Sequence, residues 1–164
     1  MGMDRAAIKN RMDKIFPKTA DNNYQGSKIA LWVFALLALF STGRSLVHYF
    51  APDGGAGSIA GLDLSKGAEN IIFSFGLWGL SQLIYAFIQL LVAFRYRTLI
   101  PLFYIILFIE TIGRMAVGRM KPPVLLHGTP PGGIANYILL VLTIIMFILS
   151  LRTAKGSRDK SEGK

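Results

Sequence analysis

Residues 29–50 read IALWVFALLALFSTGRSLVHYF, and this stretch decides the fold class. An α-helix rises about 1.5 Å per residue and the hydrocarbon core of a bilayer is about 30 Å thick, so the stretch is long enough to cross a membrane. It lacks the alternation of apolar and polar residues that a lipid-facing β-strand requires. The sequence therefore predicts a transmembrane helix here.

Three further stretches meet the same criterion of length and hydropathy: residues 71–94, 99–118 and 134–151. The chain is 52% hydrophobic and 16% charged, and its mean hydropathy is +0.47. These values are too apolar for a soluble domain of this length. The predicted fold is all-α, a four-helix transmembrane bundle that occupies residues 28–151 and satisfies its backbone polar groups within helices.

The basic residues are distributed unevenly, and Lys and Arg accumulate in the cytoplasmic flanks of membrane proteins. Thirteen of the eighteen precede the first span, separate the second span from the third, or follow the fourth. The opposite flanks hold Lys66, Arg119 and Lys121, while Arg44 and Arg114 lie inside spans. This pattern predicts a multi-pass protein of the plasma membrane or bacterial inner membrane, with both termini in the cytoplasm.

Polar segments precede and follow the predicted bundle. Residues 1–27 form an arm in which we expect an amphipathic helix over residues 3–16, ended by Pro17. Its apolar positions are Ile8, Met12, Ile15 and Phe16. Such a helix suits the inner leaflet, and a solvated or partner-bound arm is the alternative interpretation. Residues 152–164 form a basic cytoplasmic tail.

Charged residues inside the spans need partners, because a charge at the bilayer centre costs about 2.5–3.5 kcal/mol on insertion scales. Glu110 and Arg114 are four residues apart, with the acid toward the amino end, which favours an ion pair. At about 1.5 Å per residue, Arg44 and Arg114 both lie about 22 Å from the basic side, in the outer leaflet. Gln82 of the descending second span reaches a similar depth. We expect these four side chains to converge on a ligand-binding site.

Two further features extend the candidate site. His48 completes the set of candidate ligand-binding residues. In the second span, Gln82, Tyr85 and Gln89 follow one another at offsets of three and four, which places a polar stripe on one helix face. Hydrogen bonding to a neighbouring helix is the favoured interpretation of Gln89.

The two halves of the bundle follow a similar plan. Residues 43–44 and 113–114 are both Gly-Arg, and in each half a proline follows the arginine by eight residues, Pro52 and Pro122. Each half is therefore predicted to be a helical hairpin, and the two hairpins would be parallel repeats related by an axis along the membrane normal. Coincidence is the alternative, because Gly, Arg and Pro are common at span ends.

Several chemistries are excluded by composition. The chain has no Cys, which removes thiol catalysis, disulfide exchange, Cys zinc sites and iron–sulfur clusters. No phosphate-binding loop or catalytic elbow is present, so we expect no cofactor, no metal and no catalytic residue. The net charge of +9 belongs to membrane flanks and comes without an aromatic stacking platform, which argues against nucleic acid as a partner.

Residues 112–133 read IGRMAVGRMKPPVLLHGTPPGG between two apolar stretches. With a Gly-Arg pair at 113–114 followed by Gly118 and Pro122, the third and fourth spans resemble those of small uncharacterised four-helix bacterial integral membrane proteins. The chain departs from that group at Asn136, where a carboxylate often opens the last span. The resemblance implies a four-helix architecture and no particular substrate.

Three classes of function follow from these features. The favoured one is a noncatalytic protein, either an accessory subunit of a larger membrane complex or a binder of a lipid or similar amphiphile. In it, Arg44 and Arg114 would hold an anionic headgroup and Glu110 would balance their charge. The second is a small proton-coupled transporter that uses Glu110 and forms a homo-oligomer. The least favoured is a membrane enzyme with His48 or Glu110 as a base.

Overall fold

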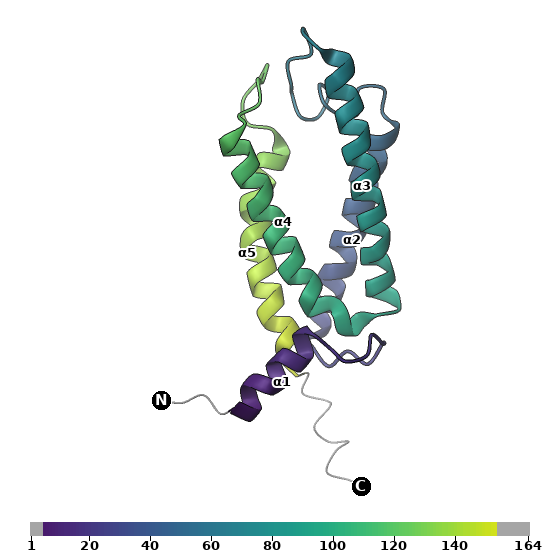
Figure 1. Cartoon of the computed structure of the whole chain (residues 1–164), viewed down its shortest axis with the longest axis vertical. Helices are drawn as coiled ribbons and strands as arrows, with labels where there is room; N and C mark the ends of the chain where they lie inside the picture. Colours follow the sequence, from purple (N-terminus) through teal and green to yellow (C-terminus); the bar gives the residue numbers. More distant parts are fainter. Residues whose placement is uncertain (1–4, 154–164) are drawn as a thin grey trace.

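The computed structural model describes residues 5–153, with side chains from Ile8 onward, and in this part of the chain the regular structure is helical. Figure 1 shows a long bundle with a short helix that slants away from one end. The helices are α1 (Arg5–Ile15), α2 (Lys28–Phe50), α3 (Ala68–Phe94), the 3-10 turn η1 (Arg97–Leu99), α4 (Ile100–Met120) and α5 (Pro131–Leu151).

Four of these helices, α2 to α5, are long and apolar enough to cross a membrane, which confirms the predicted four-span fold. Some begin earlier than the apolar runs, because their first turns are polar or small. Ser27 caps α2, its hydroxyl accepting a hydrogen bond from the Ile29 amide at 3.2 Å. Pro131 opens α5 at a position where its missing N–H is not needed.

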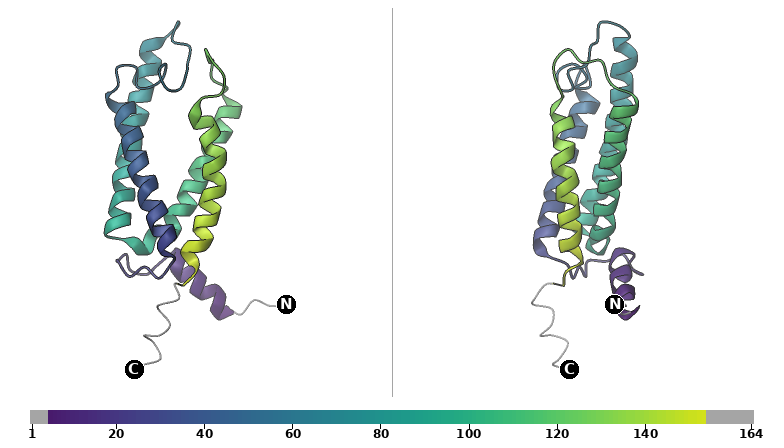
Figure 2. Two further views of the ribbon diagram at one scale, coloured as in Figure 1. Left: turned by 180° about the vertical axis from the view of Figure 1, so that it is seen from behind. Right: turned by 90° about the vertical axis from the view of Figure 1, so that its left-hand side faces the viewer.

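The four helices form two hairpins, α2 with α3 and α4 with α5. We call the end that carries α1 and residues 95–99 the base, and the end that carries residues 51–67 and 121–130 the loop end. The hairpins lie close together at the base and diverge toward the loop end (Figures 1 and 2). The two hairpins were predicted from the sequence. That the hairpins are repeats of one ancestral sequence stays a prediction.

An aromatic core joins the hairpins near the base. The ring of Phe34 on α2 packs edge-on against Phe103 and Tyr104 of α4, with centroid distances of 6.0 and 5.7 Å. The Tyr104 hydroxyl donates a hydrogen bond to the carbonyl of Ala30 at 2.6 Å. This core fixes the hairpins at one end and leaves polar side chains to bridge them farther out.

Most of the bundle surface is apolar. In the most apolar 18-residue segment of each span, the share of residues that are buried inside the protein ranges from 11% in α3 to 33% in α4. Large side chains such as Phe40, Phe87 and Ile138 are exposed. A surface of this kind requires lipid as its solvent, so the chain is a multi-pass membrane protein.

The amphipathic helix expected within residues 3–16 is α1. Lys14 attaches it to the end of α5, where its ammonium group donates to the Leu151 carbonyl at 3.0 Å and to the Thr153 hydroxyl at 2.9 Å. Leu151 is the last residue of α5, so a cation meets a carbonyl that has no partner within the helix. Most of the predicted basic tail, residues 154–164, lies outside the described residues.

Candidate functional site

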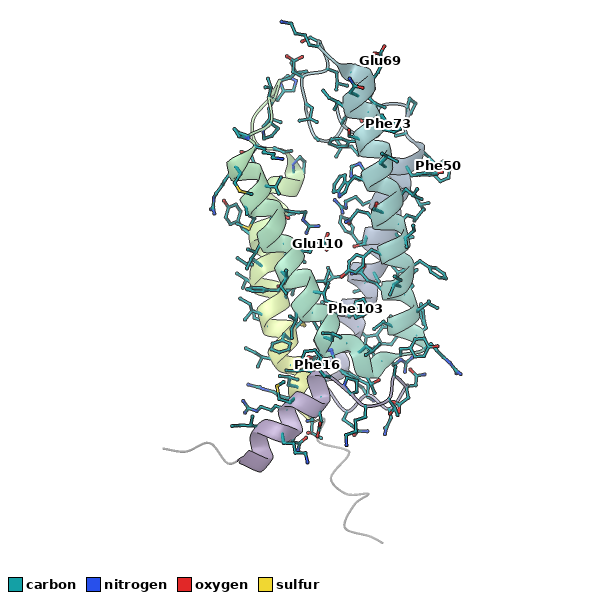
Figure 3. All side chains as sticks on the ribbon, in the orientation of Figure 1. Phe16, Phe50, Glu69, Phe73, Phe103 and Glu110 are labelled. Carbon is teal, nitrogen blue, oxygen red and sulfur yellow. The ribbon has the colours of Figure 1, made fainter. Side chains whose placement is uncertain are left out.

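A chain of hydrogen bonds links the two hairpins on the loop-end side of the aromatic core. Arg44 Nη2 donates to Gln82 Oε1 at 3.0 Å, and Gln82 Nε2 donates to Glu110 Oε1 at 3.2 Å. The same carboxylate oxygen accepts from Arg114 Nη1 at 2.8 Å. We call these four residues the polar cluster. Figure 3 shows Glu110 on the side of α4 that faces the α2–α3 hairpin.

The structure thus brings together four of the five side chains proposed from sequence, and it shows how they are connected. Glu110 and Arg114 occupy one face of α4 as the four-residue spacing requires. Gln82 on α3 joins them to Arg44 because an amide both donates and accepts. The site is therefore built from three helices, and the second span is its central element.

The polar cluster carries unequal charge. Its two guanidinium groups face one carboxylate, which leaves a formal excess of one positive charge. Among the described residues Glu110 pairs with Arg114, and Arg44 has no carboxylate partner. The Arg44 guanidinium carbon lies 5.0 Å from the ring centroid of Trp78, a cation–π contact. A ring and a neutral amide stabilise this cation without neutralising it.

Trp78 belongs to the site although the sequence analysis did not select it. The signal was its spacing, since Trp78 precedes Gln82 by one helical turn on the same face of α3. An aromatic residue next to a polar stripe is easily assigned to lipid contact, and the Arg44 contact depends on packing between α2 and α3.

His48 does not join the hydrogen-bonded chain. Its Nδ1 lies 2.7 Å from the carbonyl oxygen of Gly54, its ring centroid lies 4.7 Å from that of Trp78, and the residue is 4% exposed. Gly79 allows this packing, because a Cβ at that position would lie 2.8 Å from the His48 backbone. His48 therefore supports the ring under Arg44 and is closed to a ligand.

The polar cluster remains partly accessible. The side chains of Arg114 and Glu110 are 26% and 23% exposed, even though both lie within a membrane span. Arg114 Nη2 also approaches the Thr111 hydroxyl at 3.5 Å, which orients the guanidinium from its own helix. Part of each side chain therefore lies at the surface of the bundle and is not enclosed by it.

Further polar atoms lie between the helices on the base side of the cluster. Gln89 is fully buried, and neither of its amide atoms hydrogen-bonds to another helix within residues 5–153, so the interhelical bond predicted for it is wrong. The Tyr85 hydroxyl approaches the Gln89 side chain on its own helix. Neither this hydroxyl nor the buried Arg114 Nε makes a hydrogen bond within 3.5 Å to another of the described residues. Tyr85 instead stacks its ring on Phe103 at a centroid distance of 6.2 Å. Buried polar atoms that lack interhelical hydrogen bonds therefore lie on the base side of the polar cluster.

The two loops at the loop end are joined to each other. The Asp63 amide donates to the Val124 carbonyl at 3.0 Å, and the Leu126 amide donates to the Gly61 carbonyl at 2.9 Å. This short antiparallel bridge connects the hairpins across the end of the bundle. The loop at 121–130 is thus more than a connector within its own hairpin.

The first loop is organised around one carboxylate. Asp53 accepts hydrogen bonds from the backbone amides of Ser58 at 2.7 Å and Gly55 at 2.8 Å. These two amides, in that order, are the main causes that lower the pKa of Asp53 below its ordinary value. The loop is therefore most ordered when Asp53 is ionised.

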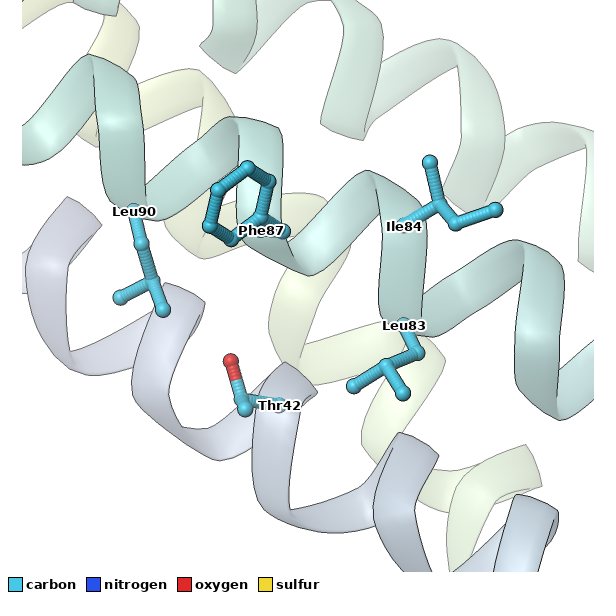
Figure 4. A pocket seen from close by; sticks show the side chains of 5 residues that line it. All are labelled: Thr42, Leu83, Ile84, Phe87 and Leu90. Carbon is cyan, nitrogen blue, oxygen red and sulfur yellow. The ribbon is translucent and has the colours of Figure 1, made fainter.

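Two cavities on the surface of the described residues are not lined by the polar cluster. A cavity of about 320 Å³ lies against α2 and α3, and Figure 4 shows the five side chains that line it. Its walls are apolar, and its single hydroxyl, that of Thr42, donates to the Ala38 carbonyl at 2.8 Å. A second cavity, of about 360 Å³, lies between residues 57–61 and 127–131 of the two loops. The first suits a lipid chain and offers no polar recognition.

Comparisons with known proteins leave the family open. No family model, curated protein or solved structure matches this chain. The resemblance to small four-helix bacterial membrane proteins stays a prediction. Within residues 5–153, no three His, Asp or Glu side chains gather closely enough to hold a metal ion. Function must therefore be argued from the polar cluster itself.

Proposed function

We propose that this protein is a noncatalytic membrane protein that binds a lipid or similar amphiphile through its anionic headgroup at the polar cluster. The observation that carries the proposal is the unbalanced charge of Arg44 inside a membrane span. An uncompensated cation in the bilayer is costly, and a phosphate or carboxylate is the natural partner of a guanidinium. The headgroup would supply the missing negative charge.

The surroundings of Arg44 support recognition as well as neutralisation. The Trp78 ring and the Gln82 amide hold the guanidinium from two sides, so little side-chain freedom remains to be lost on binding. The Glu110–Arg114 pair lies on the facing helix, where the Arg114 guanidinium would repel a cationic group that replaced the anion. The acyl chains would remain among the apolar faces of the hairpins.

We further propose that the base faces the cytoplasm of the plasma membrane or bacterial inner membrane. Support comes from the thirteen basic residues in the flanks on that side. The exposed apolar faces of α2 to α5 also have room for protein neighbours, so the amphiphile would be bound either by this chain alone or within a larger membrane complex. The protein could be an accessory subunit of a larger complex and still bind a lipid headgroup at the polar cluster.

The test is identification of the lipids that copurify after extraction in a mild detergent. Native mass spectrometry of the wild type should reveal an anionic lipid that Arg44→Gln loses and Arg44→Lys partly retains. Arg119→Gln is the matched control, because it removes the same charge from an exposed site in the last turn of α4. If Arg44→Gln and Arg119→Gln retain the same lipids as the wild type, the headgroup site is refuted.

A second candidate is proton-coupled transport through Glu110. The specific observation in its favour is that Glu110 binds both Gln82 and Arg114, so protonation would weaken the link between the hairpins. We rank it lower because Glu110 is the one acidic residue in the predicted spans, residues 29–50, 71–94, 99–118 and 134–151, and a proton route across the bilayer would need a chain of such groups. Proton-driven uptake into vesicles that disappears with Glu110→Gln would reverse this ranking.

A further inference from the structure

Helix α1 presents an apolar stripe that the bundle leaves uncovered. Ile8 and Met12 are 41% and 49% exposed, and Phe16, just after the helix, is 55% exposed. The three positions are four residues apart and therefore follow one side of the helix. Three large apolar side chains in a row on a short polar helix indicate a contact that this chain does not itself supply.

Basic side chains accompany the stripe. Lys9 and Arg11 are exposed, whereas Lys14 is held by the end of α5. Asp13 is the one acid in residues 8–16. The combination of an apolar stripe with basic neighbours is typical of helices that lie in the headgroup layer of anionic membranes. A protein partner would need no such excess of positive charge.

The position of α1 supplies a second, independent argument. Its Lys14 contact fixes it beside Leu151, where α5 ends, and the base also contains the start of α2 at Lys28 and the end of α3 at Phe94. Span ends mark the level at which the chain leaves the hydrocarbon. Figures 1 and 2 show the C-terminal end of α1 beside the base at this level, with the helix slanting away from the bundle toward its N-terminal end. A lipid surface is therefore adjacent to the exposed stripe.

We infer that α1 docks onto the membrane surface around the base, with Ile8, Met12 and Phe16 inserted at the acyl boundary and Lys9 and Arg11 on anionic headgroups. The contact is separate from the polar cluster, which lies nearer the loop end, and it does not depend on the proposed function. Lys14 couples it to α5, so docking fixes the arm relative to the second hairpin.

The absence of cysteine from the sequence makes this inference directly testable. Met12→Cys places a unique label on the stripe, and Asn10→Cys places one on the opposite, polar side of the same helix. Each full-length protein carries an environment-sensitive fluorophore and is reconstituted into vesicles with or without anionic lipid. Quenching by brominated acyl chains measures insertion. The Met12 label should be quenched in anionic vesicles and the Asn10 label should not.

Charge removal provides the second readout. Each Lys or Arg near an anionic surface shifts docking by about fivefold. Lys9→Gln with Arg11→Gln should therefore reduce the docked-to-undocked ratio of the Met12 label by about 25-fold, and high salt should have a similar effect. Both positions are exposed, so neither change disturbs the bundle.

Two results would overturn the inference. Equal quenching of the two labels would mean that α1 has no lipid-facing side. Protection of the Met12 label from water without quenching, and regardless of lipid charge, would mean that a protein partner or a second copy of the chain covers the stripe. Neither result bears on Arg44, whose variants test a different site.

Discussion

Gln82→Leu should separate the two hairpins at the polar cluster, because this side chain makes both hydrogen bonds that cross from α2 through α3 to α4. The bonds measure 3.0 Å to Arg44 and 3.2 Å to Glu110. A hydrogen bond to a charged group contributes about 1.5–3 kcal/mol when buried, and polar contacts in membranes often contribute less. With the side chains of Glu110 and Arg114 about one quarter exposed, we expect Gln82→Leu to lower the free energy of unfolding by about 2–3 kcal/mol in total.

Gln89→Leu is the matched control, since it makes the same substitution two turns along the same helix. Gln89 is buried and makes no hydrogen bond to another helix among the described residues, so leucine there should leave stability unchanged or raise it. Reversible unfolding in mixed micelles, followed by circular dichroism, measures both changes. Equal stabilities for the two variants, or a loss confined to Gln89→Leu, would refute the assignment of Gln82 as the bridge between the hairpins.

Three further outcomes are expected. Gly79→Ala should destabilise the α2–α3 hairpin by about 1–3 kcal/mol, because the added methyl meets the α2 backbone, whereas Gly76→Ala, with open space around it, should be neutral or mildly stabilising in the same unfolding assay. Hydrogen bonds from the loop backbone lower the pKa of Asp53 in the folded state. The contribution of Asp53 to loop stability is therefore complete above the ordinary carboxyl pKa of about 3.9 and is lost as the pH falls through the lowered folded value. Asp53→Asn should abolish this pH dependence, which amide hydrogen exchange in the first loop would measure. A single cysteine at Ser65 should react with an impermeant maleimide from outside intact cells and one at Thr19 should not, and the opposite result would invert the proposed orientation.

The sequence was sufficient for the elements that depend on composition and depth. Long apolar runs predicted the four spans, because a bilayer demands a minimum length of apolar helix. Counting rise per residue also placed Arg44, Gln82, Glu110 and Arg114 at similar depth, since a span restricts a side chain to one level along the membrane normal. That restriction makes convergence in a membrane bundle more predictable than it is in a soluble core.

Features that depend on rotation about the helix axes could not be read in this way. Whether Gln89 meets another helix, and whether Trp78 lies under Arg44, is decided by how α2, α3 and α4 turn toward one another. The bridge between the loops pairs Leu62 with Leu125, residues far apart in sequence whose amino acids carry no pairing signal. The depth of a residue in the membrane follows from its position in its own span, whereas the direction in which its side chain points depends on how the helices pack together.

The central claim is that Arg44 holds an anionic headgroup, and competition between matched lipids tests it most directly. The delipidated protein is titrated with an equal mixture of an anionic and a zwitterionic lipid that share the same acyl chains, and native mass spectrometry counts which lipid is bound. A charge-assisted contact of about 1.5–3 kcal/mol predicts that the wild type prefers the anionic lipid by about 10-fold or more. Arg44→Gln should abolish the preference and Arg119→Gln should preserve it. Equal binding of the two lipids to the wild type would contradict the account.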